Sequence, residues 1–170
     1  MLFRSEFMRL GRPKLGFLVT AGNIDSMVSH YTVAKKKRKS DSYSPGGRTG
    51  LRPDRATITY SQMIRRAYPD VPIIIGGLEA SLRRLGHYDY WKDRVMPSIL
   101  IDAEADLLIY GMAEKTVVEV AEALQSGLRI SDLTYIRGTV YLAETIAEPA
   151  DTIILPPFTA VSTDKVTFAK

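Results

Sequence analysis

Short apolar runs that stop at glycine recur three times along the chain. The runs are Leu15–Thr20, Val71–Ile75 and Asp106–Tyr110, and the turns that follow them are Ala21-Gly22-Asn23, Gly76-Gly77 and Gly111. An unbroken apolar run that ends at glycine is typical of a parallel strand buried on both faces. The sequence therefore predicts three such strands, each followed by a tight turn.

Helical spacing of apolar residues fills the segments between these runs. The clearest helix is predicted over 113–126, with Gly127 at its end, and a second over 56–68 is ended by Pro69. A short helix over 24–31 would be capped by Asn23 or Asp25. Weaker patterns predict one or two helical turns over 78–85, a brief strand or helix end over 98–101, a strand within 130–142 and a last strand over 152–155.

Alternating strands and helices predict an α/β protein, a Rossmann-like three-layer fold with a mainly parallel sheet. All the glycine turns would then lie along the carboxyl edge of the sheet, where ligands bind in such folds, at a topological switch point. We expect one domain over residues 1–155. Residues 156–170 would be a linker or tail in which a helix begins near Asp164.

Composition limits the chemistry of the chain more than it limits the fold. The 170 residues are 45% hydrophobic and 25% charged, which suits one globular domain. No apolar run approaches the roughly 20 residues of a membrane span, and residues 1–12 do not form a signal peptide, so we expect a cytoplasmic protein without a membrane partner. The absence of cysteine excludes disulfides, thiolate-bound zinc and an iron–sulfur cluster ligated by this chain, and we expect no metal site.

Charge is distributed unevenly along the sequence. Residues 1–55 hold 12 basic and 4 acidic side chains, a balance of +8, and the remainder holds 11 and 15, a balance of −4, which together give the net charge of +4. Five consecutive cations, Lys35–Lys39, open a loop that extends to Gly50. This loop is either a solvated surface or a contact for a phosphate, a nucleic acid or another domain.

Two groups of residues are candidates for binding. The first is the predicted strand-end edge, a candidate cofactor site made of Asn23, Gly76, Gly77, Glu79, Gly111 and Glu114. The two glycines would either admit a ligand close to the backbone or simply form a tight turn. Each glutamate would bind a ribose hydroxyl or cap its own helix.

The second group would contact a ligand or another domain. It consists of Arg52, Arg55, His87, Asp89, Tyr90 and Trp91. The two arginines flank Asp54, either as a structural ion pair or as a phosphate site. His87 and Asp89 have the composition of a base with its orienting acid, but no nucleophile accompanies them, so we predict no catalytic residue. The aromatic residues would stack on a base or sugar, or complete a core.

Five longer stretches resemble a known family. They are Thr20–Val28 (TAGNIDSMV), Arg52–Ala56 (RPDRA), Pro72–Arg84 (PIIIGGLEASLRR), His87–Trp91 (HYDYW) and Asp106–Glu114 (DLLIYGMAE). Together they closely resemble the amino-terminal region of the YgiQ-type radical SAM proteins, whose reaction is unassigned. The resemblance covers the chain from about Phe7 to its end. It implies a domain similar to the cobalamin-binding Rossmann-like domains that precede many radical SAM barrels.

The resemblance also implies what lies outside this chain. In that family a barrel follows, whose C-x-x-x-C-x-x-C loop binds a [4Fe–4S] cluster that reduces S-adenosylmethionine to a 5′-deoxyadenosyl radical. Cobalamin domains usually carry a histidine in the loop that corresponds to residues 21–25, and none is present here, so cobalamin is possible but not expected. We therefore expect a truncated fragment that is not catalytic alone, an accessory domain whose partner is the barrel of its parent chain, and whose substrate is unknown. The alternatives are a nucleic-acid-binding module that uses the basic first third, or a free-standing nucleotide-binding domain.

Overall fold

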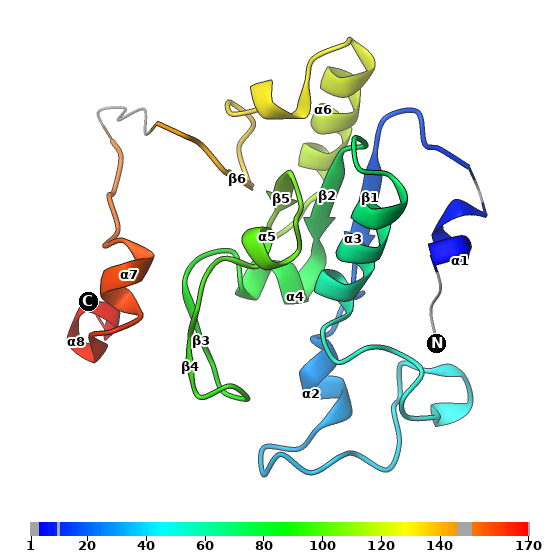
Figure 1. Ribbon diagram of the computed structural model, residues 1–170, viewed down its shortest axis with the longest axis vertical. Helices are drawn as coiled ribbons and strands as arrows, with labels where there is room; N and C mark the ends of the chain where they lie inside the picture. Colours follow the sequence, from blue (N-terminus) through cyan, green and yellow to red (C-terminus); the bar gives the residue numbers. More distant parts are fainter. Residues whose placement is uncertain (1–3, 10, 146–150, 170) are drawn as a thin grey trace.

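The computed structural model describes residues 4–9, 11–145 and 151–169, and its centre is a four-stranded sheet (Figure 1). The strands stand in the order β1 (Phe17–Thr20), β2 (Ile73–Gly76), β5 (Leu107–Ile109) and β6 (Thr139–Tyr141). The first three are parallel, and β6 runs antiparallel to β5. The predicted α/β fold with a mainly parallel sheet is confirmed.

The carboxyl ends of the parallel strands lie along one edge of the sheet. Thr20 is in register with Gly76, and Ile75 with Leu108. The three glycine turns therefore follow one another along this edge, as predicted. The described strands follow chain order without a reversal, however, so the expected topological switch point is not found in the described part of the sheet.

Helices cover both faces of the sheet and make three layers. On one face, α3 (Ala56–Ala67), α4 (Gly77–Leu82) and α5 (Ile99–Asp102) pack on β1, β2 and β5 through residues such as Ile64 and Leu100. On the other face, α6 (Glu114–Gln125) packs through Val120 on Ile74 and Leu107. The α6 layer does not reach over most of β1. Leu18, which lies on that face of β1, is therefore 64% exposed.

The helices begin and end close to where their patterns predict. The ranges predicted from residues 56 and 113 correspond to α3 and α6, and the turns predicted over 78–85 correspond to α4. The short helix α2 (Ser26–His30) is capped by Asp25, whose side chain accepts hydrogen bonds from the backbone N–H groups of Met27 and Val28. Asp25, and not Asn23, is therefore the N-cap.

A small antiparallel hairpin was missing from the prediction. It pairs β3 (His87–Asp89) with β4 (Arg94–Met96), with His87 opposite Met96. The segment over 98–101, for which strand and helix were both open, is α5. The hairpin extends beyond the carboxyl edge of the sheet, on the same side as α2 (Figure 1).

The strand predicted over Thr152–Leu155 is wrong. These residues form no strand, because no strand among the described residues lies beside them to pair with their backbone. The Ile153 side chain is 86% exposed. The segment after it contains α7 (Phe158–Val161) and α8 (Lys165–Ala169). The second begins after Asp164 as expected, since that carboxylate accepts hydrogen bonds from the next backbone N–H groups. The domain boundary at residue 155 stays a prediction.

The remaining elements are short. Helix α1 (Arg4–Met8) lies beside α3, with the Phe7 ring 6.3 Å from that of Tyr60. Two 3-10 turns, Pro45–Gly47 and Ile130–Asp132, lie in the connections. Within the described ranges, no helix is long and apolar enough to cross a membrane.

Candidate functional site

A pocket of about 440 Å³ lies beyond the carboxyl edge, between the chain that follows α2 and the β3–β4 hairpin. We call it the aromatic pocket, and its lining is Asp25, Val28, Tyr31, Thr32, Val33, Arg38, Leu82, Arg83, His87, Tyr88, Asp89, Tyr90 and Trp91. Four candidates from the sequence meet here, namely His87, Asp89, Tyr90 and Trp91. Sequence reasoning missed the opposite wall, because its residues, such as Val28, Tyr31 and Arg38, lie far earlier in the sequence.

Aromatic contacts join the two walls of this pocket. The Trp91 ring centroid lies 5.0 Å from that of Tyr31 and 5.5 Å from that of Tyr90. The Tyr90 hydroxyl donates a hydrogen bond of 2.7 Å to the backbone oxygen of Val33, and the Lys35 ammonium lies 4.8 Å from the Tyr90 ring centroid. The loop after α2 therefore rests on the hairpin, and one side of the pocket is bounded by π surfaces.

Both carboxylates of the pocket are already engaged by arginine. Asp89 lies 2.6 Å from an Arg55 nitrogen and accepts hydrogen bonds from the backbone N–H groups of Trp91 and Lys92. Burial alone would raise the pKa of Asp89, but these donors and the arginine outweigh burial and lower it. Asp25 is likewise paired with Arg83.

His87 forms no hydrogen bond or ion pair with Asp89. Its Nδ1 lies 3.2 Å from the backbone oxygen of Leu85, and the partners of Asp89 are backbone N–H groups and Arg55. Burial lowers the pKa of the half-buried His87 below its ordinary value, so the ring is neutral near pH 7. The arrangement is not that of a base held by its acid.

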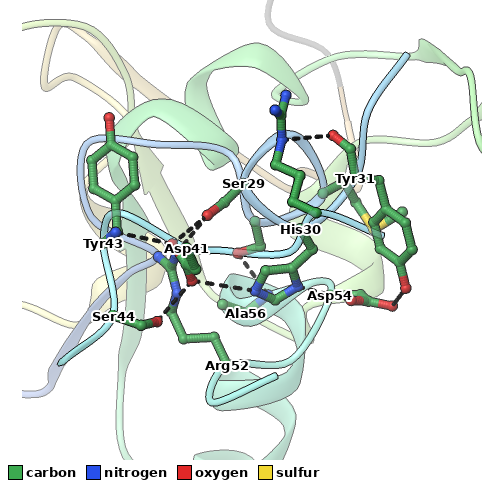
Figure 2. A network of polar contacts seen from close by, with 12 residues as sticks. Ser29, His30, Tyr31, Asp41, Tyr43, Ser44, Arg52, Asp54 and Ala56 are labelled. Atoms are coloured by element: carbon green, nitrogen blue, oxygen red, sulfur yellow. Dashed lines mark hydrogen bonds and ion pairs between the residues drawn. The ribbon is translucent and has the colours of Figure 1, made fainter. Parts of the chain in front are cut away.

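Beside the pocket, a network of polar side chains fixes the loop that contains residues 40–55 (Figure 2). The Asp41 carboxylate accepts hydrogen bonds from the Ser29 hydroxyl at 2.8 Å, the Ser44 hydroxyl at 2.7 Å, the Tyr43 backbone N–H at 2.9 Å and the Arg52 guanidinium at 2.9 Å. Burial would raise the pKa of Asp41, but these donors hold it well below its ordinary range. Asp41 therefore stays charged although it is buried.

His30 extends the network to a second carboxylate. Its Nδ1 lies 2.9 Å from Asp54 and its Nε2 lies 3.8 Å from Asp41, while the Tyr31 hydroxyl donates to Asp54 at 2.8 Å. The expectation that two arginines surround Asp54 is wrong. Arg52 pairs with Asp41 and Arg55 with Asp89, because the chain turns between them and sends the two guanidiniums in different directions.

Glu79 binds the beginnings of two helices other than its own. Its carboxylate oxygens accept hydrogen bonds of 3.0 Å from the backbone N–H of Ser26, the first residue of α2, and from that of Thr57 in α3. The side chain is 3% exposed. The prediction that Glu79 caps its own helix is wrong, because α4 positions this carboxylate between two other helix N-termini with free N–H groups.

The two strand-end glycines are explained by close internal packing. A Cβ on Gly77, whose φ is +80°, would lie 2.3 Å from the Thr20 hydroxyl, and one on Gly76 would lie 3.3 Å from the Ile109 oxygen. These contacts favour the tight-turn interpretation over ligand approach. The other edge candidates, Asn23, Gly111 and Glu114, are exposed, so their part in binding stays a prediction.

Comparison with known proteins identifies the family. Residues 3–170 match the family model described as Radical SAM N-terminal. The chain belongs to this family. It is 55% identical over 165 residues to a UPF0313 protein of Clostridium botulinum (strain ATCC 19397 / Type A), and 56% identical over 167 residues to one of Methanocella arvoryzae, matches that cover 97% and 98% of this chain.

The chain corresponds to only part of the length of each relative. The chain spans 26% of the length of the Clostridium botulinum protein and 28% of the Methanocella arvoryzae protein, so about a quarter of each. A third relative, the UPF0313 protein of Clostridium perfringens strain 13, is 56% identical over 166 residues, which is 25% of its length. No solved structure matches the chain.

The cofactors that the family implies do not fit the residues of this chain. The sequence has no cysteine for an iron–sulfur cluster, and in the described ranges no three His, Cys, Asp or Glu side chains gather as metal ligands. For cobalamin, the histidine nearest the first strand end is His30, which is 7% exposed and engaged with Asp54. We assign no cofactor to these residues.

Proposed function

We propose that this chain is an accessory domain that covers the mouth of the radical SAM barrel in a longer protein. The carboxyl edge of the sheet would face the barrel, and the aromatic pocket would form part of the route by which substrate reaches it. A [4Fe–4S] cluster and S-adenosylmethionine would belong to the barrel. The observation that carries the proposal is the aromatic pocket at this edge, with exposed apolar side chains beside it.

Exposed side chains at the edge support the proposal. Met112, directly after β5, is 85% exposed, and Val33, at the tip of the loop after α2, is 83% exposed. Tyr88 on the hairpin is 48% exposed beside the pocket. Apolar side chains grouped around a hollow are a common feature of surfaces that contact another domain.

The chemistry of the pocket supports a binding role rather than a catalytic one. Both of its carboxylates are neutralised by arginines, and the low pKa of His87 keeps that ring uncharged. Groups held in this way can accept, orient and shield a substrate, and the radical would come from the barrel. We therefore propose that substitutions in the pocket change substrate binding more than the generation of the radical.

A crosslinking experiment on a full-length form of the protein tests the proposed contact. A photoreactive benzoylphenylalanine is placed at position 112, on the carboxyl edge, or at position 128, where α6 has led the chain away from that edge (Figure 1). We expect a crosslink between domains from position 112 and none from position 128, where the native Leu128 is 43% exposed. Equal crosslinking from both positions, or crosslinking from 128 alone, would contradict the proposal.

A further inference from the structure

A second hollow, of about 570 Å³, adjoins the aromatic pocket. We call it the basic groove, and its lining is Ile24, Ser29, Thr32, Lys36, Lys37, Arg38, Lys39, Ser40, Ser42 and Tyr43. Four of these side chains are cations and none is a carboxylate. Thr32 and Arg38 line both hollows, so the two form one continuous surface with a π-rich part and a cationic part.

The cations of the groove are free to meet an anion. In the part of the chain that the structure describes, Lys36, Lys37 and Lys39 take part in no ion pair, and all three are exposed. Arg38 is held at the junction of the hollows, since its Nε donates to the backbone oxygens of Val28 at 3.0 Å and Tyr31 at 3.1 Å. Its terminal nitrogens keep their capacity to donate to a ligand.

Most of the neighbouring carboxylates are paired with arginines that lie outside the groove. Asp25 and Asp89 in the aromatic pocket are paired with arginines, and Asp41 behind the groove is buried against Arg52. Asp54 contacts His30 and Tyr31, and its charge also acts on Lys37. An incoming phosphate therefore meets four cations at the groove, of which Lys37 is partly offset by Asp54.

We infer that the two hollows together bind an unpaired nucleotide of single-stranded nucleic acid. The base would stack on the aromatic wall formed by Tyr31, Tyr90 and Trp91, and the flanking phosphates would lie along Lys36, Lys37 and Lys39. Aromatic side chains beside a cationic groove are the combination by which proteins hold single strands. A duplex would not satisfy the pocket, because its bases are stacked inside the helix.

The size and order of the two parts agree with this ligand. A volume of about 440 Å³ lies within the range of roughly 300–1,000 Å³ typical of small-molecule sites. Arg38, at the junction, would contact the sugar–phosphate unit that links the base in the pocket to the phosphates in the groove. A surface that bound only acidic lipids or peptides would use the cations and leave the aromatic wall without a partner.

The single tryptophan of the chain reports directly on this binding, because Trp91 lies in the pocket. The probes are 12-nucleotide oligo(U) RNA, oligo(dT) DNA and a DNA duplex, each at 50 and 200 mM salt. We expect both single strands to quench Trp91 fluorescence more than the duplex. If three or four phosphates are contacted, affinity falls about 20- to 50-fold over this salt range. A preference for RNA identifies RNA as the source, and equal affinity identifies single strands in general.

Two matched variants distinguish binding at the basic groove from non-specific attraction of nucleic acid to positive charge. The groove variant combines Lys36→Ala, Lys37→Ala and Lys39→Ala. The control combines Arg66→Ala, Lys115→Ala and Lys165→Ala, which removes the same charge from exposed positions on α3, α6 and α8. We expect the groove variant to lose at least tenfold more affinity than the control, measured by anisotropy of a labelled oligonucleotide. Thermal unfolding checks that both variants are folded.

A variant of the aromatic wall tests stacking. Trp91→Ala should weaken single-strand binding about 5- to 100-fold, and Trp91→Phe, which keeps a ring, should recover most of the loss. The inference is overturned if single strands show no salt-dependent binding, if duplex binds equally without quenching, or if the groove and control variants behave alike.

Discussion

Two groups of charged side chains, one at each edge of the sheet, differ in burial. At the amino edge, Arg12 and Asp70 form a two-pronged ion pair at 2.9 and 2.7 Å, but their side chains are 56% and 68% exposed. At the carboxyl edge, Asp41 and Glu79 are only 1% and 3% exposed and accept several hydrogen bonds each. The same carboxylate chemistry is a surface contact at Asp70 and part of an internal framework at Asp41 and Glu79.

The buried carboxylates lie in or against a part of the chain that has few apolar side chains. Between residues 22 and 55, Met27 is the one hydrophobic side chain that is buried, whereas Asp25, Ser26, Ser29, His30, Asp41 and Ser44 are all buried polar residues. This region has little apolar area with which to order its backbone. Hydrogen bonds to a few buried carboxylates supply the order, and they hold the walls of the aromatic pocket and the basic groove in place.

The strongest test of the contrast removes Asp41. Asp41→Ala leaves the partly buried Arg52 guanidinium and two serine hydroxyls without their acceptor, and we expect a loss of about 3 kcal/mol in the free energy of unfolding. Asp70→Ala at the amino edge is the matched control. Both are measured by urea denaturation, and similar losses for the two variants would remove the distinction between the edges.

A second test weakens the link between the helices. Glu79→Gln keeps the shape of the side chain but places an amide N–H₂ against a backbone N–H of α2 or α3. We expect a loss of about 2 kcal/mol, because a buried hydrogen bond to a charged acceptor is replaced by an unsatisfied donor. Glu114→Gln, exposed on α6, is the control and should change little. An unaltered stability for Glu79→Gln would show that the carboxylate is not needed at this junction.

The pH dependence of stability gives a smaller signature. Because the folded state lowers the pKa of Asp41, its contribution is complete above the unfolded pKa of about 4 and is lost as pH falls toward the folded value. Between pH 5 and pH 3 the native protein should lose about 1 kcal/mol more than Asp41→Asn, which has no proton to bind at this site. Parallel pH profiles of the two proteins would contradict this linkage.

The smallest effect is expected at the amino edge. Arg12→Ala removes an ion pair whose partners are both more than half exposed and solvated by water. We expect the Tm of Arg12→Ala to equal that of the native protein. We also expect 0.5 M salt to change the Tm of both proteins by the same amount. A clear loss of Tm in Arg12→Ala would mean that the surface pair also orders its edge.

Local patterns were sufficient for the central strands and their covering helices, because each depends on residues close in sequence, but they missed the β3–β4 hairpin and wrongly predicted a strand over Thr152–Leu155. The runs before Gly22, Gly76 and Gly111 became β1, β2 and β5, and the pattern after Ala113 became α6. The pairing of Asp41 with Arg52, by contrast, joins the loop after Lys39 to a residue beyond its end, and the composition of that segment predicted only a loop.

The lining of the aromatic pocket was only half predictable for the same reason. The density of aromatic and polar residues over His87–Trp91 correctly indicated one wall of the pocket. The opposite wall comes from residues 28–38, about 50 positions earlier. Glu79 was interpreted from its own helix alone, whereas its partners Ser26 and Thr57 lie on two others. The spacing of residues along the sequence does not predict contacts between segments this far apart.

The orientation of the carboxyl edge toward the rest of a longer protein is the central claim, and amide hydrogen exchange tests it most directly. Exchange is compared between the 170-residue chain and a full-length form that contains the barrel. We predict slower exchange in the full-length form over residues 21–24 and 110–113, and unchanged exchange over the amino-edge segments 11–16, 69–72 and 126–129. Protection confined to the amino edge, or none at either edge, would contradict the account.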